Sequence, residues 1–296
     1  DLLDLGPSNQ TGACRLLFDE QKEEAKYKAH RRNKPNAGLE KAGLLERLHR
    51  QFDTSCQPAL ILSAEWGYRA KPESLMRLKA LFQPHCERIE VYIYLRRPEA
   101  FMNSVFQQRI KGSGEGFLPP WPKYREMCLK HERIFGADQV NLRVYDRDRF
   151  PKGDVVADFF DWTGLDGMQS MTLERNKSLS AAGVALMGCY RRHKPQAGIA
   201  SGDPEVKWLV NRLRALKAPK LALSPGLVEK TLRRHRDELD WLEARLGQPF
   251  AEVFHAADGK QEGTGAVYFV GSEEDFRRAA AHFAPLLSGE TPAEPP

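Results

Sequence analysis

The segment 91–110 constrains the fold more than any other part of this 296-residue chain. Residues 91–95 form an apolar run rich in β-branched and aromatic side chains, which is typical of a buried strand. After this run come Arg96 and Arg97, and then Pro98, at a position where a helix can begin without losing a backbone hydrogen bond. Beyond Pro98, apolar residues recur at helical spacing as far as Ile110. The pattern therefore predicts a strand, a tight turn and a helix in succession.

Arg96 and Ser104 are the residues in and after this turn that could bind a ligand. Arg96 directly follows the predicted strand, and Ser104 lies eight residues later on the predicted helix. In open α/β sheets, ligands bind at the carboxyl ends of the strands. An arginine fork beside a hydroxyl, near a helix N-terminus, suits a phosphate dianion. The alternatives are an Arg96 that caps a helix or pairs with Asp146, and a Ser104 that bonds back to its own helical turn.

Composition excludes several classes of protein. A hydrophobic content of 41% with 29% charged residues is ordinary for a soluble globular protein. The net charge of +5 is too small to indicate a nucleic-acid partner, although it tolerates an anionic cofactor or substrate. No apolar run approaches the length of a membrane span, and the cysteines and histidines show no metal-ligand spacing. We therefore expect a cytoplasmic protein with reduced thiols and no metal. The sequence does not indicate an oligomeric state.

Strand patterns alternate with helix patterns in the first half of the chain. The predicted strands are 58–63, 91–95 and 140–145. The predicted helices between and around them are 39–52, 73–82, 98–110, 123–135 and 154–162. This alternation predicts an α/β fold with three layers, α/β/α, around a central parallel sheet.

The last third of the chain is predicted to be helical. Its helix patterns are 179–190, 204–216 and 225–246. We expect a single domain over 1–288, with an α/β core at 55–165 and a helical cover at 175–250. The tail 289–296 is expected to be disordered.

Four segments, taken in order, resemble those of bacterial-type sulfotransferases, which use 3′-phosphoadenosine 5′-phosphosulfate (PAPS). The turn 95–98 with Ser104 resembles the family's 3′-phosphate-binding motif. The other three are the Leu-Ile-Leu-Ser-Ala-Glu run at 60–65, the Val-Tyr-Asp-Arg-Asp run at 144–148 with the helix pattern 154–165, and the Asn-Lys-Ser-Leu-Ser run at 176–180. Together they cover roughly residues 55–185. The resemblance implies the P-loop-like fold of that family.

One family motif is absent from this sequence. Family members begin with a strand and a loop resembling Gly-x-x-Lys-Thr-Gly-Thr-Thr, which wraps the 5′-phosphosulfate. The segment 6–12 contains glycines but no lysine. Because residue 1 is not Met, we expect the loop to lie upstream of residue 1. The alternative is a chain that lost the loop and no longer catalyses transfer.

The resemblance implies transfer of a sulfuryl group from PAPS to a hydroxyl, or less readily an amine, of a carbohydrate or small-molecule acceptor. The product of the donor is adenosine 3′,5′-bisphosphate. Arg96 and Ser104 would hold the 3′-phosphate, and Arg97 is expected to point away. Such a displacement depends on positioning, electrostatic stabilisation and a general base. Glu65, just past a predicted strand end, is the candidate base; the alternative is a surface carboxylate that pairs with Arg69.

The sequence is also compatible with two other functions. A nucleotide or small-molecule kinase of related fold would need a Mg²⁺-binding acid and a P-loop lysine. A non-catalytic nucleotide- or glycan-binding protein would need neither a base nor the missing loop.

Overall fold

A computed structural model of the chain describes residues 10–19, 41–111, 120–165, 178–193, 204–216 and 220–251. The chain divides into two compact units, and the boundary between them crosses both strands of one small sheet. The first unit comprises Asp1–Ile93 and Lys123–Leu142, and the second comprises Tyr94–Pro122 and Arg143–Pro296. The expected single domain over 1–288 stays a prediction. The tail 289–296 lies outside the described residues.

The sheet pairs β1 (Val91–Leu95) with β2 (Val140–Val144), and the two strands are parallel. Just beyond the strand ends, the backbone N–H of Tyr145 donates to the carbonyl of Leu95 at 2.8 Å. The predicted strands 91–95 and 140–145 are therefore confirmed, and so is a mixed α/β fold with a parallel sheet. Among the described residues this sheet has two strands.

The predicted strand at 58–63 is wrong. Within this segment Ile61 alone makes a β-bridge, and the flanking residues form no strand. The backbone N–H of Ser63 donates to the side-chain Oε1 of Gln10 at 2.7 Å. A side chain thus satisfies a backbone donor that a neighbouring strand would otherwise pair. An apolar run shows that a segment is buried, but it does not distinguish a strand from an irregular extended segment.

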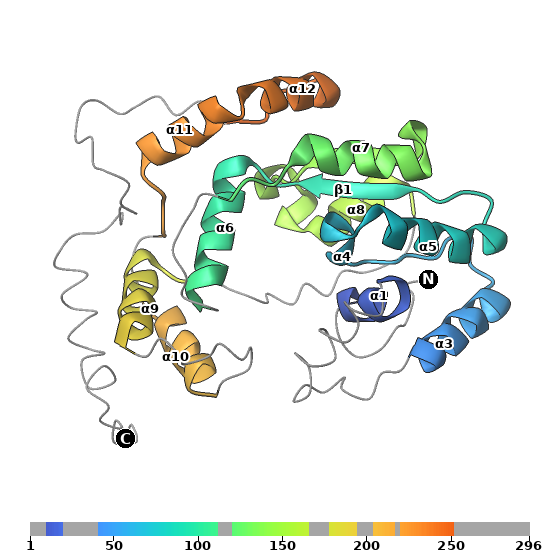
Figure 1. Cartoon of the computed structure of the whole chain (residues 1–296), viewed down its shortest axis with the longest axis horizontal. Helices are drawn as coiled ribbons and strands as arrows, with labels where there is room; N and C mark the ends of the chain where they lie inside the picture. Colours follow the sequence, from blue (N-terminus) through green and yellow to red (C-terminus); the bar gives the residue numbers. More distant parts are fainter. Residues whose placement is uncertain are drawn as a thin grey trace. The chain divides into compact units, whose positions relative to one another are not determined.

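The first unit is built mainly from helices (Figure 1). Their apolar side chains form one core. Its helices are α1 (Thr11–Phe18), α3 (Lys41–Thr54), α4 (Trp66–Arg69), α5 (Pro72–Phe82) and α7 (Tyr124–Phe135), with short 3₁₀ turns at Gln83–His85 and Ala137–Gln139. Phe18, Leu44 and Leu48 are almost completely buried in its core. Burial of a side chain of this size stabilises the fold by about 1.5–3 kcal/mol. The predicted helices 39–52, 73–82 and 123–135 are confirmed.

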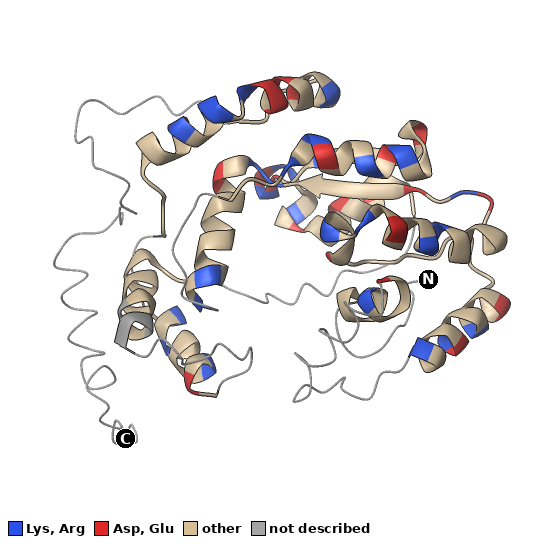
Figure 2. Cartoon of the chain, in the orientation of Figure 1, with Lys and Arg blue, Asp and Glu red and all other residues tan. Residues whose placement is uncertain are grey.

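The second unit contains the helical C-terminal part of the chain. Its helices are α6 (Pro98–Lys111), α8 (Val155–Thr163), α9 (Ala181–His193), α10 (Pro204–Arg214), α11 (Pro225–Arg234) and α12 (Arg236–Leu246), with 3₁₀ turns at Arg147–Arg149 and Pro151–Gly153. Helix α6 packs against α9, which packs against α10. The last turns of α6 and α10 both carry basic residues (Figure 2).

The predicted helix 225–246 is two helices. His235 separates α11 from α12, with φ −113° and ψ 23°. Ser224 caps the start of α11, because its side chain accepts a hydrogen bond from the N–H of Leu227 at 3.2 Å. The remaining predicted helices of the last third, 179–190 and 204–216, are confirmed as α9 and α10.

A buried carboxylate joins β1, β2 and α8 in the second unit. The Tyr94 hydroxyl donates to Asp158 Oδ2 at 2.5 Å, and Arg143 Nη1 lies 3.0 Å from Asp158 Oδ1. The Arg143 guanidinium also lies 4.5 Å from the centre of the Trp162 ring. Burial, the hydrogen bond to Asp158 and the charge of Asp158 raise the pKa of Tyr94 well above its usual value.

This raised pKa predicts a loss of stability in alkali. Because the pKa of Tyr94 is higher in the folded state, its stabilising contribution is complete below about pH 10, the usual pKa of tyrosine, and is lost as the pH rises beyond it. The free energy of unfolding should therefore fall between about pH 9 and about pH 11 by more in the wild type than in Tyr94→Phe. Urea unfolding at both pH values measures the difference. Equal losses in the two proteins would contradict the prediction.

Candidate anion-binding site at the strand ends

Arg96 and Ser104 contact each other, as the strand–turn–helix pattern suggests. Arg96 Nη1 donates to the Oγ of Ser104 at 3.1 Å. Arg96 follows the buried last residue of β1 and is itself exposed, while Ser104 lies in the second turn of α6. In this fully described helix, the Ser104 hydroxyl makes no hydrogen bond to the carbonyls of its own turn. Its proton therefore remains available to a ligand.

The aromatic ring of Tyr145 also contacts the Arg96 guanidinium. The Cζ atom of Arg96 lies 5.3 Å from the centre of the Tyr145 ring, within the range of a cation–π interaction. The ring of Phe150 packs edge-on against Tyr145 with a centroid distance of 5.1 Å. Since the Tyr145 backbone is also bonded to Leu95, both the ring and the arginine are held at the carboxyl ends of the two strands.

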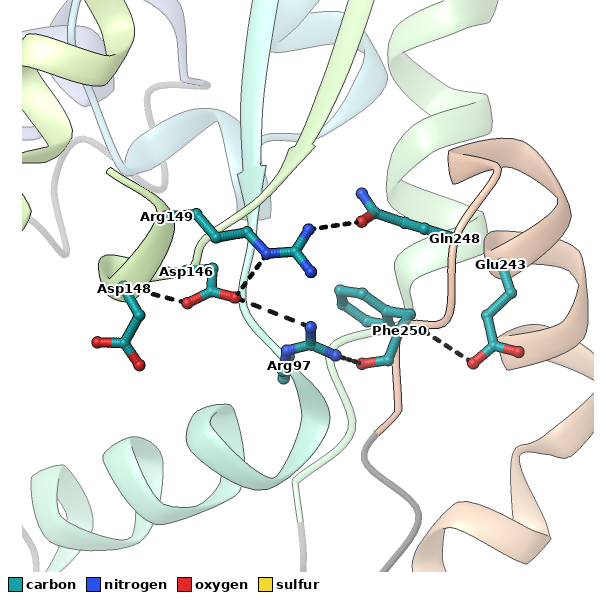
Figure 3. A network of polar contacts seen from close by, with 7 residues as sticks. All are labelled: Arg97, Asp146, Asp148, Arg149, Glu243, Gln248 and Phe250. Carbon is teal, nitrogen blue, oxygen red and sulfur yellow. Dashed lines mark hydrogen bonds and ion pairs between the residues drawn. The ribbon is translucent and has the colours of Figure 1, made fainter. Parts of the chain in front are cut away.

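Arg97 takes different partners from Arg96 (Figure 3). Arg97 Nη1 donates to the carbonyl of Phe250 at 2.8 Å, and its Nη2 lies 4.0 Å from Asp146 Oδ2. Arg149 also pairs with Asp146, with 3.4 Å between Nε and Oδ2. Asp146 is thus occupied by Arg97 and Arg149, so the alternative pairing of Asp146 with Arg96 is not formed.

This network fastens the segment after α12 to the strand ends. Phe250 is completely buried, and its N–H donates to Glu243 Oε1 at 2.9 Å. Arg149 Nη1 donates to Gln248 Oε1 at 3.2 Å (Figure 3). The sequence does not predict the contacts of Arg97 with Phe250 and of Arg149 with Gln248, because they join residues 153 and 99 positions apart.

Glu65 lies in the first unit, at the N-terminal end of the short helix α4. Its side chain is exposed, and it makes no ion pair with Arg69 or with any other described residue. Gln10, which contacts the backbone of Ser63, directly precedes α1. Residues 10–12 of the glycine-containing segment 6–12 therefore lie at the start of α1, and residues 6–9 lie outside the described residues.

The predicted segment 176–180 is described from Ser178 onward. Ser180 caps α9, because its Oγ accepts a hydrogen bond from the N–H of Gly183 at 3.2 Å. The N–H of Leu179 donates to the Oε1 of the buried Gln107 at 3.0 Å. This segment is consequently attached to the same helix, α6, that carries Ser104.

The described residues contain neither a cluster of metal-binding side chains nor a helix that could span a membrane. No group of three or more His, Cys, Asp and Glu side chains in the described ranges is arranged to hold a metal ion. None of the helices in the described part of the chain is long and apolar enough to cross a membrane.

Comparison with known proteins finds sequence similarity to an archaeal protein. The chain is 27% identical over 161 residues to an uncharacterised protein of Archaeoglobus fulgidus. The match covers 52% of this chain and 42% of the archaeal protein, so this chain spans less than half the length of that relative. No family model matches the sequence, and no solved structure matches it.

Proposed function

We propose that this chain is a PAPS-dependent sulfotransferase in which Arg96 and Ser104 bind the 3′-phosphate of the donor. The contact between these two side chains, at the carboxyl end of a parallel strand, carries the proposal. Ligands of open α/β sheets bind at that end of the strands. The proposal includes the three-layer α/β/α arrangement expected of the family, of which β1 and β2 would be part, and a cytoplasmic location.

The geometry of the pair suits a phosphate group. A guanidinium is planar and presents its N–H groups around its edge, and Tyr145 contacts it through the ring. Ser104 accepts one N–H group of Arg96 and retains a hydroxyl proton that it can donate. Arg96 and Ser104 can therefore donate to two oxygens of one dianion, in charge-assisted hydrogen bonds. The 5′ half of the donor is not assigned to a residue.

The proposed reaction is an in-line displacement at sulfur. The acceptor hydroxyl oxygen forms a bond to sulfur as the bond from sulfur to the 5′-phosphate oxygen breaks, and adenosine 3′,5′-bisphosphate leaves. A general base takes the proton of the acceptor hydroxyl. We assign this role to Glu65, whose exposed carboxylate has no described partner. The acceptor would be a carbohydrate or another small molecule that carries a hydroxyl.

Arg96→Ala should weaken binding of adenosine 3′,5′-bisphosphate by about tenfold or more, the loss expected for one charge-assisted contact. Isothermal titration calorimetry measures this affinity directly. Arg88→Ala is the matched control, because Arg88 is an exposed arginine that precedes the opposite end of β1. Adenosine 5′-monophosphate lacks the 3′-phosphate, so its weaker binding should not change in Arg96→Ala.

Three outcomes would contradict the proposal. The first is an affinity for the bisphosphate that is the same in Arg96→Ala as in the wild type. The second is tighter binding of ATP with Mg²⁺ than of the bisphosphate, which would favour a kinase of related fold. The third is bisphosphate binding without any transfer from PAPS, which would leave a nucleotide-binding protein that is not an enzyme.

A further inference from the structure

The short helix α4 begins directly after Glu65, and it is too short to hold a position by itself. Its four residues form a single turn, which is closed by the N–H of Ala70 donating to the carbonyl of Trp66 at 3.0 Å. Isolated helices shorter than about 12 residues are marginal in water. The position of α4, and of the carboxylate at its start, therefore depends on contacts with other elements of the first unit.

Lys130, on α7, binds the C-terminal end of α4. Its Nζ donates to the carbonyl of Ala70 at 2.7 Å, to that of Tyr68 at 3.2 Å and to that of Gly67 at 3.5 Å. An ammonium group has three N–H donors, and the last carbonyls of a helix have no partner within it. The three donors of Lys130 thus meet three carbonyls at the end of α4.

The start of α4 is attached to α1. The Nε1 of the buried Trp66 donates to Asp19 Oδ1 at 3.0 Å, just after the end of α1. The ring of Trp66 also packs against that of Phe18, with a centroid distance of 5.6 Å. Glu65 is therefore next to a residue that α1 fixes, on a helix whose other end Lys130 fixes.

The setting of Lys130 makes this attachment firm. Lys130 is partly buried, and burial lowers its pKa, because the ammonium group is partly withdrawn from water. Hydrogen bonds in such surroundings are stronger than those on an exposed surface. A general base must stay within hydrogen-bond reach of the proton that it takes, and a displacement of about 1 Å can lower a rate by about 100-fold.

We infer that Lys130 is a positioning residue for Glu65, because by holding the end of α4 it fixes the carboxylate at the start of α4. This inference rests on the proposed function, in which Glu65 is the general base. Lys130 acts through the backbone of α4, and it is not assigned a contact with the donor or the acceptor. Its loss should consequently lower the turnover number and leave binding of the donor unchanged.

Lys130→Met keeps the length of the side chain and removes its three N–H donors. It should lower the turnover number of sulfuryl transfer by about tenfold or more, while the KM for PAPS and the affinity for adenosine 3′,5′-bisphosphate stay unchanged. The matched control is Lys79→Met, because Lys79 is a partly buried lysine of the same unit whose Nζ donates to the carbonyl of Ile134 on α7 at 2.7 Å. This control should keep the turnover number within about twofold of the wild type.

A double variant separates positioning of the base from a general effect on folding. In the Glu65→Gln protein, Lys130→Met should lower the turnover number by less than about twofold, because the base that Lys130 positions is already absent. The full loss in that background would overturn the inference, and so would an unchanged turnover number in Lys130→Met or an equal loss in Lys79→Met. If the thermal midpoint shows that Lys130→Met does not fold, Lys130→Gln keeps a donor and should show a smaller loss in the same direction.

Hydrogen exchange tests the attachment of α4 without any measurement of activity. The amide of Ala70 should exchange about tenfold faster or more in Lys130→Met than in the wild type, and at the wild-type rate in Lys79→Met. Unchanged exchange in Lys130→Met would overturn the inference. A wild-type protein that transfers no sulfate from PAPS would overturn the proposed function and, with it, the catalytic role of Lys130. Transfer that Lys130→Met leaves intact would overturn the present inference alone.

Discussion

Glu65→Gln is expected to lower the rate of sulfuryl transfer by about 100-fold to about 10,000-fold, the usual contribution of a general base. The substitution keeps the size of the side chain and removes its ability to take the acceptor proton. Affinity for adenosine 3′,5′-bisphosphate should not change, because Glu65 is not assigned to the donor. Transfer of radiolabelled sulfate from PAPS to a carbohydrate acceptor measures the rate, with the turnover number separated from KM.

Glu87→Gln is the control for this experiment. Glu87 is an exposed glutamate of the same unit, with no described partner. Its replacement should leave the turnover number within about twofold of the wild type. A Glu65→Gln protein that transfers sulfate as fast as the Glu87→Gln protein would remove Glu65 from the mechanism. Because that result concerns the base alone, it would leave the assignment of Arg96 and Ser104 intact.

Asp158→Ala should lower the free energy of unfolding by about 3 kcal/mol, the lower end of the cost of breaking a buried ion pair. The substitution removes the acceptor of the Tyr94 hydroxyl and the partner of Arg143. The Arg143 side chain retains 35% of its accessible surface, so water offsets part of the loss. Urea unfolding followed by circular dichroism measures the difference.

A graded series makes this prediction sharper. Asp158→Asn keeps an acceptor for Tyr94 and loses only the charge, so it should cost less than Asp158→Ala. Asp161→Ala removes an exposed carboxylate from the same helix, α8, and should change stability by less than about 0.5 kcal/mol. Similar losses in the Asp158 and Asp161 variants would show that the buried carboxylate contributes no more than a surface one.

Local sequence patterns predict the strand–turn–helix segment that carries the candidate site. The apolar run 91–95, the proline at 98 and the helical spacing beyond it are confirmed as β1 and α6. The contact of Arg96 with Ser104 follows from them, because a strand end and the next two helical turns have little freedom to separate.

Two predictions are wrong because their sequence patterns are compatible with more than one structure. Residues 58–63 are apolar enough for a strand, but the backbone N–H of Ser63 pairs with the side chain of Gln10. The stretch 225–246 keeps helical spacing throughout and contains no proline or glycine after residue 226, so its division at His235 has no local mark. Both results depend on what packs around the segment.

By itself, the sequence determined the strand–turn–helix unit and the pairing of a guanidinium with a hydroxyl at its turn. Only the tertiary structure decided that Tyr145 supports Arg96 and that Asp146 binds Arg97 and Arg149 instead. Contacts between residues close along the chain follow from backbone geometry. Contacts between distant residues depend on strand register and helix packing, which the whole core sets and no short pattern records.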